Sequence, residues 1–167
     1  MGDNILTKYT VQEKLNKMNV EIFSITPTTY AGAVGDNNVI FADHEIENFA
    51  MEDGGKGIIQ SIVILDDDDN GAAMDIFIHT RSGAVGTEGS AVSVTTSVLI
   101  QSIKGVIPIT TYSDGINWQI GHKENIGTVI DCTSSSRSVF LTAVNRSGGS
   151  KTYTASGLVL KIGVIRD

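Results

Sequence analysis

The sequence predicts an all-β protein: an antiparallel β-sandwich or jelly roll of about eight strands, with one short helix and an N-terminal arm. Two observations lead to this class. Eighteen glycines against two prolines, with many Val, Ile and Thr residues, favour strands joined by tight turns. The strand-like runs are also short, and they follow one another without the regular alternation of strand and helix that a parallel sheet requires.

Residues 1–18 differ in pattern from the rest of the chain, and we treat them as an arm ahead of a β-sandwich domain over 19–167. Val11, Leu15 and Met18 recur at helical spacing, which predicts one or two helical turns. A helix this short is marginal in isolation. Two interpretations remain open: an arm that orders on a partner or a neighbouring subunit, and a terminus that is merely frayed.

The domain begins with the strand-like run 20–25, which a polar loop over 30–38 follows. The run 39–49 then alternates between two kinds of position. One side carries Phe41, Asp43, Glu45 and Glu47, and the other carries Ile40, Ala42, His44 and Ile46. This alternation predicts a strand with one face in water.

The run 58–65 is apolar on both faces at its end, as expected for a central strand of the core. It stops at the acidic segment 66–71, and the next run, 72–80, places Met74, Ile76 and Ile78 on one face. Because Asn and Gly adopt positive φ at little cost, the Asn-Gly pair between these two runs predicts a β-hairpin.

A Gly- and Ser-rich loop over 81–93 opens the second half of the domain. The segment 95–104 fits a short helix or a strand, and the helical spacing of its apolar residues favours the helix. The remaining strand-like runs are 106–112, 116–122, 126–132, 138–145 and 158–165. The last run alternates Leu158, Leu160, Ile162 and Val164 with a second set of side chains, so the C-terminal strand is expected to belong to the sheet.

Composition excludes several classes of function. A formal net charge of −7 argues against a DNA or RNA partner and against an anionic membrane surface. No stretch approaches the roughly 20 apolar residues of a membrane span. The start of the chain lacks the basic and apolar regions of a secretory signal, so we expect the protein to be made in the cytoplasm without passing through a standard export route. One cysteine, Cys132, leaves no intrachain disulfide.

The acidic segment matches the opening of a calcium-binding loop. Asp66, Asp68, Asn70 and Gly71 fit the pattern D-x-D-x-N-G, in which alternate oxygen ligands suit Ca²⁺. However, Phe77 occupies the position of the closing bidentate Glu, and strands rather than helices are predicted on either side. A solvated hairpin tip is therefore the better interpretation, and no metal site is predicted.

The residues that commonly carry catalysis form no constellation. His44, His79 and His122 are isolated from one another and fall on predicted strands, where ordinary structural histidines are common. There is no G-x-S-x-G motif, and Cys132 has no neighbouring base, which favours a small buried thiol. Trp118 and the few tyrosines are too scattered to form a sugar-stacking platform. We expect no catalytic residue and no cofactor.

Several segments resemble the capsid decoration (cement) proteins of tailed bacteriophages. The resemblance lies in 54–66 with 70–75, in Gly86-Thr87-Glu88 followed by 91–93, and in 152–161 with the ending Arg166-Asp167. It covers roughly residues 39–167. It implies a β-sandwich, often trimeric, that binds the outer surface of the phage head across major capsid protein subunits and stabilises the shell.

The expectation is thus a non-enzymatic structural protein of the virion, a homo-oligomer with a trimer favoured, whose partner is the major capsid protein. Candidate contacts with the capsid or a neighbour are Val11, Leu15, Met18 and Tyr30, together with the loops 30–38 and 81–93. The alternative is a head or tail fibre module that binds a host glycan or receptor, through Trp118 or the 66–70 tip. A small hydrolase on the same scaffold would need a nucleophile–base pair, which the sequence does not offer.

Overall fold

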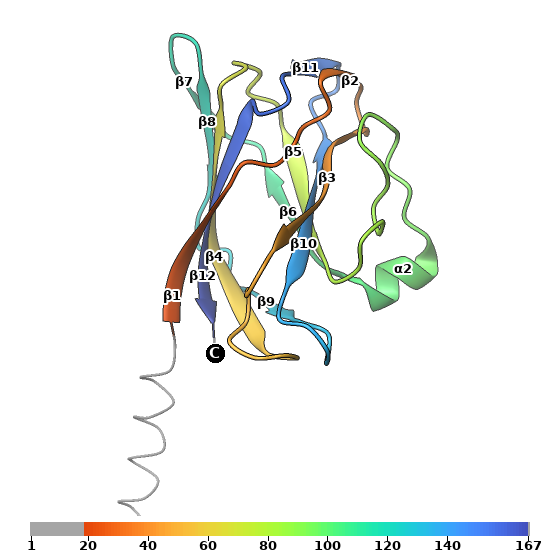
Figure 1. The fold of residues 1–167 in the computed structure, drawn as a ribbon. Coiled ribbons are helices and arrows are strands. Elements are labelled where there is room, and N and C mark those ends of the chain that lie inside the picture. The colour runs from red at the N-terminus through yellow and green to blue at the C-terminus, as the bar shows by residue number, and fades with distance from the viewer. Residues whose placement is uncertain (1–18, 167) are drawn as a thin grey trace, which may run out of the picture.

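The computed structural model describes residues 19–166, which form two packed antiparallel sheets and one short helix (Figure 1). The predicted all-β class is confirmed. The six-stranded sheet consists of β1 (Asn19–Ile25), β12 (Leu158–Arg166), β4 (Lys56–Asp66), β8 (Gln119–Lys123) and β7 (Tyr112–Asp114) in this order, with β9 (Thr128–Asp131) also paired to β4. The four-stranded sheet runs β3 (Val39–Ile46), β10 (Val139–Asn145), β5 (Met74–His79) and β6 (Ile103–Ile109). The short strands β2 (Gly32–Val34) and β11 (Lys151–Tyr153), which were not predicted, pair with each other.

The core lies between the two sheets and follows the period-two alternation of the strands. The grouping predicted for one face of 72–80 and one face of 158–165 is confirmed, and both sets face the core, because every side chain in them is fully buried. Burying one such side chain stabilises the fold by about 1.5–3 kcal/mol. The set comprises Met74, Ile76, Ile78, Leu158, Leu160, Ile162 and Val164.

A second apolar cluster covers the outer face of the four-stranded sheet. Val85 and Val98, from the segment 80–102, pack against Phe77 and Val144 of that sheet. The amide of Thr80 donates to the carbonyl of Ser102 at 3.0 Å, which closes the two ends of the segment. Its helix, α2 (Thr96–Gln101), confirms the helix predicted within 95–104, and Thr95 caps it by accepting from the amide of Val98.

The hairpin predicted across the acidic segment is wrong. β4 belongs to the six-stranded sheet and β5 to the four-stranded sheet, so the segment 66–71 crosses between the layers. The buried carboxylate of Asp66 accepts hydrogen bonds from the amides of Asp68, Asn70 and Gly71 at 3.0–3.1 Å, which curls the chain. Positive φ falls at Asp69 and Gly71, not at Asn70 as a two-residue Asn-Gly turn would require.

The prediction that 39–49 forms a strand with one solvent-exposed face is also wrong. Asp43 adopts φ 51°, and the pairing of β3 with β10 shifts register beside it. This irregularity breaks the alternation, so that Phe41, predicted to share a face with the acids, is fully buried next to Ile40. Glu47 lies beyond the end of the strand.

The predicted arm, residues 1–18, lies outside the described residues. Within 19–166, no helix is long and apolar enough to span a membrane.

Candidate functional site

The outer face of the six-stranded sheet is mostly apolar, and in Figure 1 no other segment of residues 19–166 lies over it. Strand pairing aligns Val20, Ile165, Ile58 and Val129 in one row across four strands. Side chains opposite each other in antiparallel pairs lie about 4.5–5.5 Å apart, so this row forms a continuous apolar stripe. The two ends of the row are open to solvent, with Val20 77% and Val129 57% exposed.

Three further rows join this one in the surface that we call the bare face, and the charged pair Lys56 and Asp131 bounds it at the β9 end. Ile22 aligns with Gly163 and Ser61, and Val159 aligns with Leu65 and Ile120. Between them, Lys161 and Val63 align with Ser24 on one side and His122 on the other. None of the four rows contains an aspartate or a glutamate, although the chain as a whole carries a net charge of −7. The four rows therefore differ from the chain as a whole in charge, and Ser24, Ser61, Lys161 and His122 are the polar residues among their apolar side chains.

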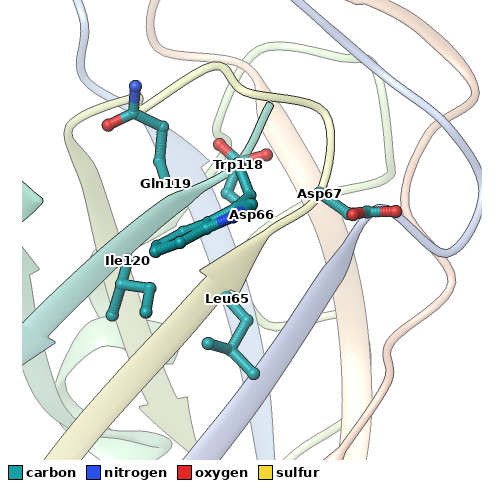
Figure 2. A pocket seen from close by; sticks show the side chains of 6 residues that line it. All are labelled: Leu65, Asp66, Asp67, Trp118, Gln119 and Ile120. Atoms are coloured by element: carbon teal, nitrogen blue, oxygen red, sulfur yellow. The ribbon is translucent and has the colours of Figure 1, made fainter. Parts of the chain in front are cut away.

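A shallow pocket of about 290 Å³ lies at one end of this surface (Figure 2). The ring of Trp118 lies beside Leu65 and Ile120 there, and it is 46% exposed. Tryptophan is one of the residue types enriched among binding hot spots. The remaining lining residues are Asp66, Asp67 and Gln119.

The β7–β8 hairpin holds Trp118 in place. The amide of Gly115 donates to the carbonyl of Trp118 at 2.8 Å, and a Cβ at position 115 would lie only 2.4 Å from the indole ring. Only glycine therefore lets the ring lie on the backbone here. The side chain of Gln119 donates to the carboxylates of Asp69 and Asp114, which ties the hairpin to the acidic segment. Ile116 at the hairpin tip is 90% exposed.

The acidic segment is built as a hydrogen-bonded turn. Both carboxylate oxygens of Asp66 accept backbone amides, and one oxygen of Asp68 accepts from the amide and hydroxyl of Thr154. Burial raises the pKa of Asp66, while these amide bonds act in the opposite direction. Across residues 19–166, no three side chains of His, Cys, Asp or Glu are grouped to hold a metal ion.

The two loops predicted as contacts, 30–38 and 81–93, are brought together by the fold. The side chain of Asn38 donates to the carbonyl of Gly89 at 2.8 Å, and the amide of Val39 donates to the carbonyl of Ser90. Tyr30 lies against Gly89 so closely that a Cβ there would be 2.7 Å from its ring. A pocket of about 650 Å³ opens beside them, lined by Tyr30, Ala42, Asp43, Gly83, Gly86, Thr87 and Glu88. The other predicted contacts, Val11, Leu15 and Met18, lie outside the described residues.

Behind this pocket, a buried histidine joins three strands. Nδ1 of His79 lies 2.8 Å from the carbonyl of Arg81, and Nε2 lies 2.9 Å from the hydroxyl of Thr142. A carboxylate oxygen of Asp43 lies 3.7 Å from Nε2 and has no hydrogen-bond partner. Burial lowers the pKa of His79. Because the amide of Asp43 also donates to the hydroxyl of Thr142 at 3.1 Å, this network links β3, β5 and β10.

The other residues singled out from the sequence lie as follows. His44 and His122 are on β3 and β8, so all three histidines lie on strands as predicted. Cys132 is buried, also as predicted. The bare face itself was not predicted. The one sign of it in the sequence is that 58–65 is apolar on both faces, which was interpreted as burial of both faces within the core.

Comparison with models of protein families and with curated proteins found no match to this chain.

Proposed function

We propose that this protein is a non-enzymatic structural subunit that adheres to a larger protein assembly through its bare face, and that the assembly is the head of a tailed bacteriophage. One observation supports the proposal that the protein adheres to an assembly. The chain covers the outer face of its four-stranded sheet with the segment 80–102, yet leaves Val20, Ile22 and Val129 exposed on the outer face of its six-stranded sheet. Contiguous apolar surface of this kind marks a site of association.

The energetics favour association with another protein. Burying one exposed Val or Ile side chain contributes about 1.5–3 kcal/mol, before the cost of association is subtracted. Val20, Ile22 and Val129 supply three such side chains, and Trp118 and Ile116 add two anchors at one end. The net charge of −7 disfavours nucleic acid and anionic lipid as the partner.

The phage head is proposed from the resemblance to decoration proteins. Its longest segments, 54–66 and 152–161, contribute to β4 and β12, the two central strands of the bare face. A shell under outward pressure from packaged DNA resists rupture better when many copies bind across its subunit seams. Each contact can be modest, because a subunit that touches several neighbours gains from multivalency. In this proposal the partner is the major capsid protein and the location is the outer capsid surface.

Three groups of residues would share the contact. The bare face and the β7–β8 tip form the central part. The joined loops at Tyr30 form a second area, and the arm with Val11, Leu15 and Met18 is the third. The trimer implied by the resemblance is part of the same proposal.

The test mixes the purified protein with undecorated phage heads. The wild-type protein is expected to add in a fixed stoichiometry and to raise the temperature at which the heads break. Val129→Asp and Trp118→Ser are each expected to weaken this binding at least tenfold. Ile100→Asp is the matched control, because it places the same charge at an exposed apolar position on α2, against the other sheet. Wild-type protein that does not bind heads would refute the phage assignment, and equal binding by all three variants would refute the role of the bare face.

A second candidate function, a fibre module that binds a host glycan, is favoured by the pocket at Tyr30. This pocket combines an exposed aromatic ring with two carboxylates, Asp43 and Glu88, and with the hydroxyl of Thr87. An aromatic ring can stack on a sugar ring, and carboxylates can accept hydrogen bonds from its hydroxyl groups. A glycan array probed with wild-type protein and with Tyr30→Ala separates the two functions, since decoration predicts no bound glycan.

A further inference from the structure

Within residues 19–166, β1 is an edge strand whose free side carries little of the usual protection. All seven of its residues pair with β12 in an unbroken register, and no strand among residues 19–166 pairs with its other side. Natural edge strands are commonly protected by proline, charged side chains (lysine above all), a β-bulge or a covering loop, and the one charge of β1, Glu21, is paired with Arg166. The sequence of β1, NVEIFSI, contains no proline and no basic residue. Its free backbone groups are therefore available to another strand.

The side chains of β1 also favour association. Val20 and Ile22 are 77% and 68% exposed and project from the bare face. The single charged residue, Glu21, forms an ion pair with Arg166 of β12, whose guanidinium lies 5.7 Å from the centre of the Phe23 ring. With Lys161 next to Ser24, this edge has no excess of negative charge. The chain as a whole carries a net charge of −7, but this edge does not share the excess of negative charge. Two copies can therefore approach each other here without strong repulsion.

We propose that β1 pairs with β1 of a second copy, antiparallel, about a two-fold axis at Ile22. In this register Ile22 lies opposite Ile22 of the second copy, and Val20 lies opposite Ser24. Glu21 lies opposite Phe23, so no like charges face each other directly. The pairing uses the same edge on both copies and closes at two subunits. It joins two six-stranded sheets into one and doubles the length of the bare face.

The pairing is weak in dilute solution. A seven-residue strand is about 23 Å long at roughly 3.3 Å per residue. The contact is therefore smaller than the roughly 1,200 Å² that a stable interface commonly buries. Copies held close together on an assembly would pair more readily, since their effective concentration is high. The inference does not depend on the phage head, and a trimer would need a surface other than this edge.

Cysteine cross-linking in the isolated protein tests the register. Under mild oxidation, Ile22→Cys is expected to give a covalent dimer, because the two-fold axis places the two sulfurs opposite each other. Val20→Cys alone and Ser24→Cys alone are expected to give none, whereas a mixture of these two variants cross-links. The wild-type protein, with its buried Cys132, supplies the background. All three positions are exposed, so the variants should fold, and thermal melting checks this.

Each outcome decides the proposal. Cross-linking of Ile22→Cys together with the mixed pair supports it. Absence of cross-linking by Ile22→Cys, or equal cross-linking by all three single variants, overturns it. Sedimentation gives an independent measure, in which Ile22→Lys is expected to abolish the concentration-dependent dimer. Heads play no part in these assays, so failure of the pairing is distinguishable from failure of the proposed decoration function.

Discussion

Ile58 and Val129 lie opposite each other in the β4–β9 pair, and both side chains point away from the core. On the other side of β4, Ile58 lies opposite Ile165. The central strand of this sheet thus carries core-like residues on two faces, but the fold buries only one of them completely. The outer set gains full burial only when another surface covers it. Four predictions follow from this and from the contacts around it.

The first prediction concerns the glycine beneath Trp118. Gly115→Ala places a methyl group 2.4 Å from the present ring position, so the indole must leave the backbone. Trp118 is the only tryptophan, so intrinsic fluorescence reports on it directly. We expect a red-shifted emission, stronger quenching by acrylamide and weaker binding to heads. Gly149→Ala is the control, because nothing lies within 4 Å of its Cβ position. An unchanged spectrum in Gly115→Ala would contradict the packing.

The second prediction concerns the turn that replaces the expected hairpin. Asp66→Ala removes the acceptor of three backbone amides in a buried position, and we expect a loss of at least about 2 kcal/mol in the free energy of unfolding. Asp66→Asn keeps one carbonyl oxygen and should lose less. Urea titration measures both, with the exposed neighbour Asp67→Ala as control. Calcium should leave the melting temperature of the wild-type protein unchanged, because amides already occupy both oxygens of Asp66.

The third prediction concerns pH. Burial lowers the pKa of His79 and of His44, so both bind a proton more weakly in the folded state than in the unfolded state. The free energy of unfolding should therefore be highest above about pH 6.5 and should fall as the pH drops below it. His79 is the more deeply buried of the two histidines, so His79→Gln should reduce this fall in stability at low pH. His44 should account for the part of the fall that remains.

Urea titrations at pH 7.5 and pH 5 measure this difference. His79→Gln is expected to be less stable by about 1–3 kcal/mol at neutral pH, since Thr142 and the carbonyl of Arg81 lose their partner. The exposed His122→Gln on β8 serves as the control. Equal pH dependence in His79→Gln and wild type would show that His79 does not carry the effect.

Much of the fold could be predicted because it depends on local alternation. The sequence of 158–165 alone shows which side chains face the core, and helical spacing within 95–104 identifies α2. The hairpin prediction failed because three amides donate to the carboxylate of Asp66 and turn the chain from one sheet to the other. The Asn-Gly dipeptide alone contains no information about these bonds. The positive φ of Asp43 similarly shifted a predicted strand face.

The candidate site was predicted only in part. Loops 30–38 and 81–93 were expected to make contacts because of their composition, and the fold joins them at Tyr30. The bare face was missed for a physical reason. Apolar residues on both faces of 58–65 indicate that both faces of the strand are buried. The pattern cannot distinguish a face covered by the same chain from a face covered by a partner.

The fourth prediction compares the two faces of β4 directly. Ile64 is fully buried between the sheets, whereas its neighbour Val63 points to the bare face and is half-buried. Ile64→Ala should lower the free energy of unfolding by about 2–5 kcal/mol, because it leaves a cavity in the core. Val63→Ala should cost less than about 1 kcal/mol in the isolated protein, since solvent already reaches this position.

Binding to heads should reverse this order for the folded proteins. Below its melting temperature, Ile64→Ala keeps the bare face and should bind nearly as well as wild type. Val63→Ala removes apolar area from the contact and should bind several-fold more weakly. If Val63→Ala instead costs as much stability as Ile64→Ala and binds heads normally, the outer side chains of β4 serve the fold alone, and the bare face needs no partner.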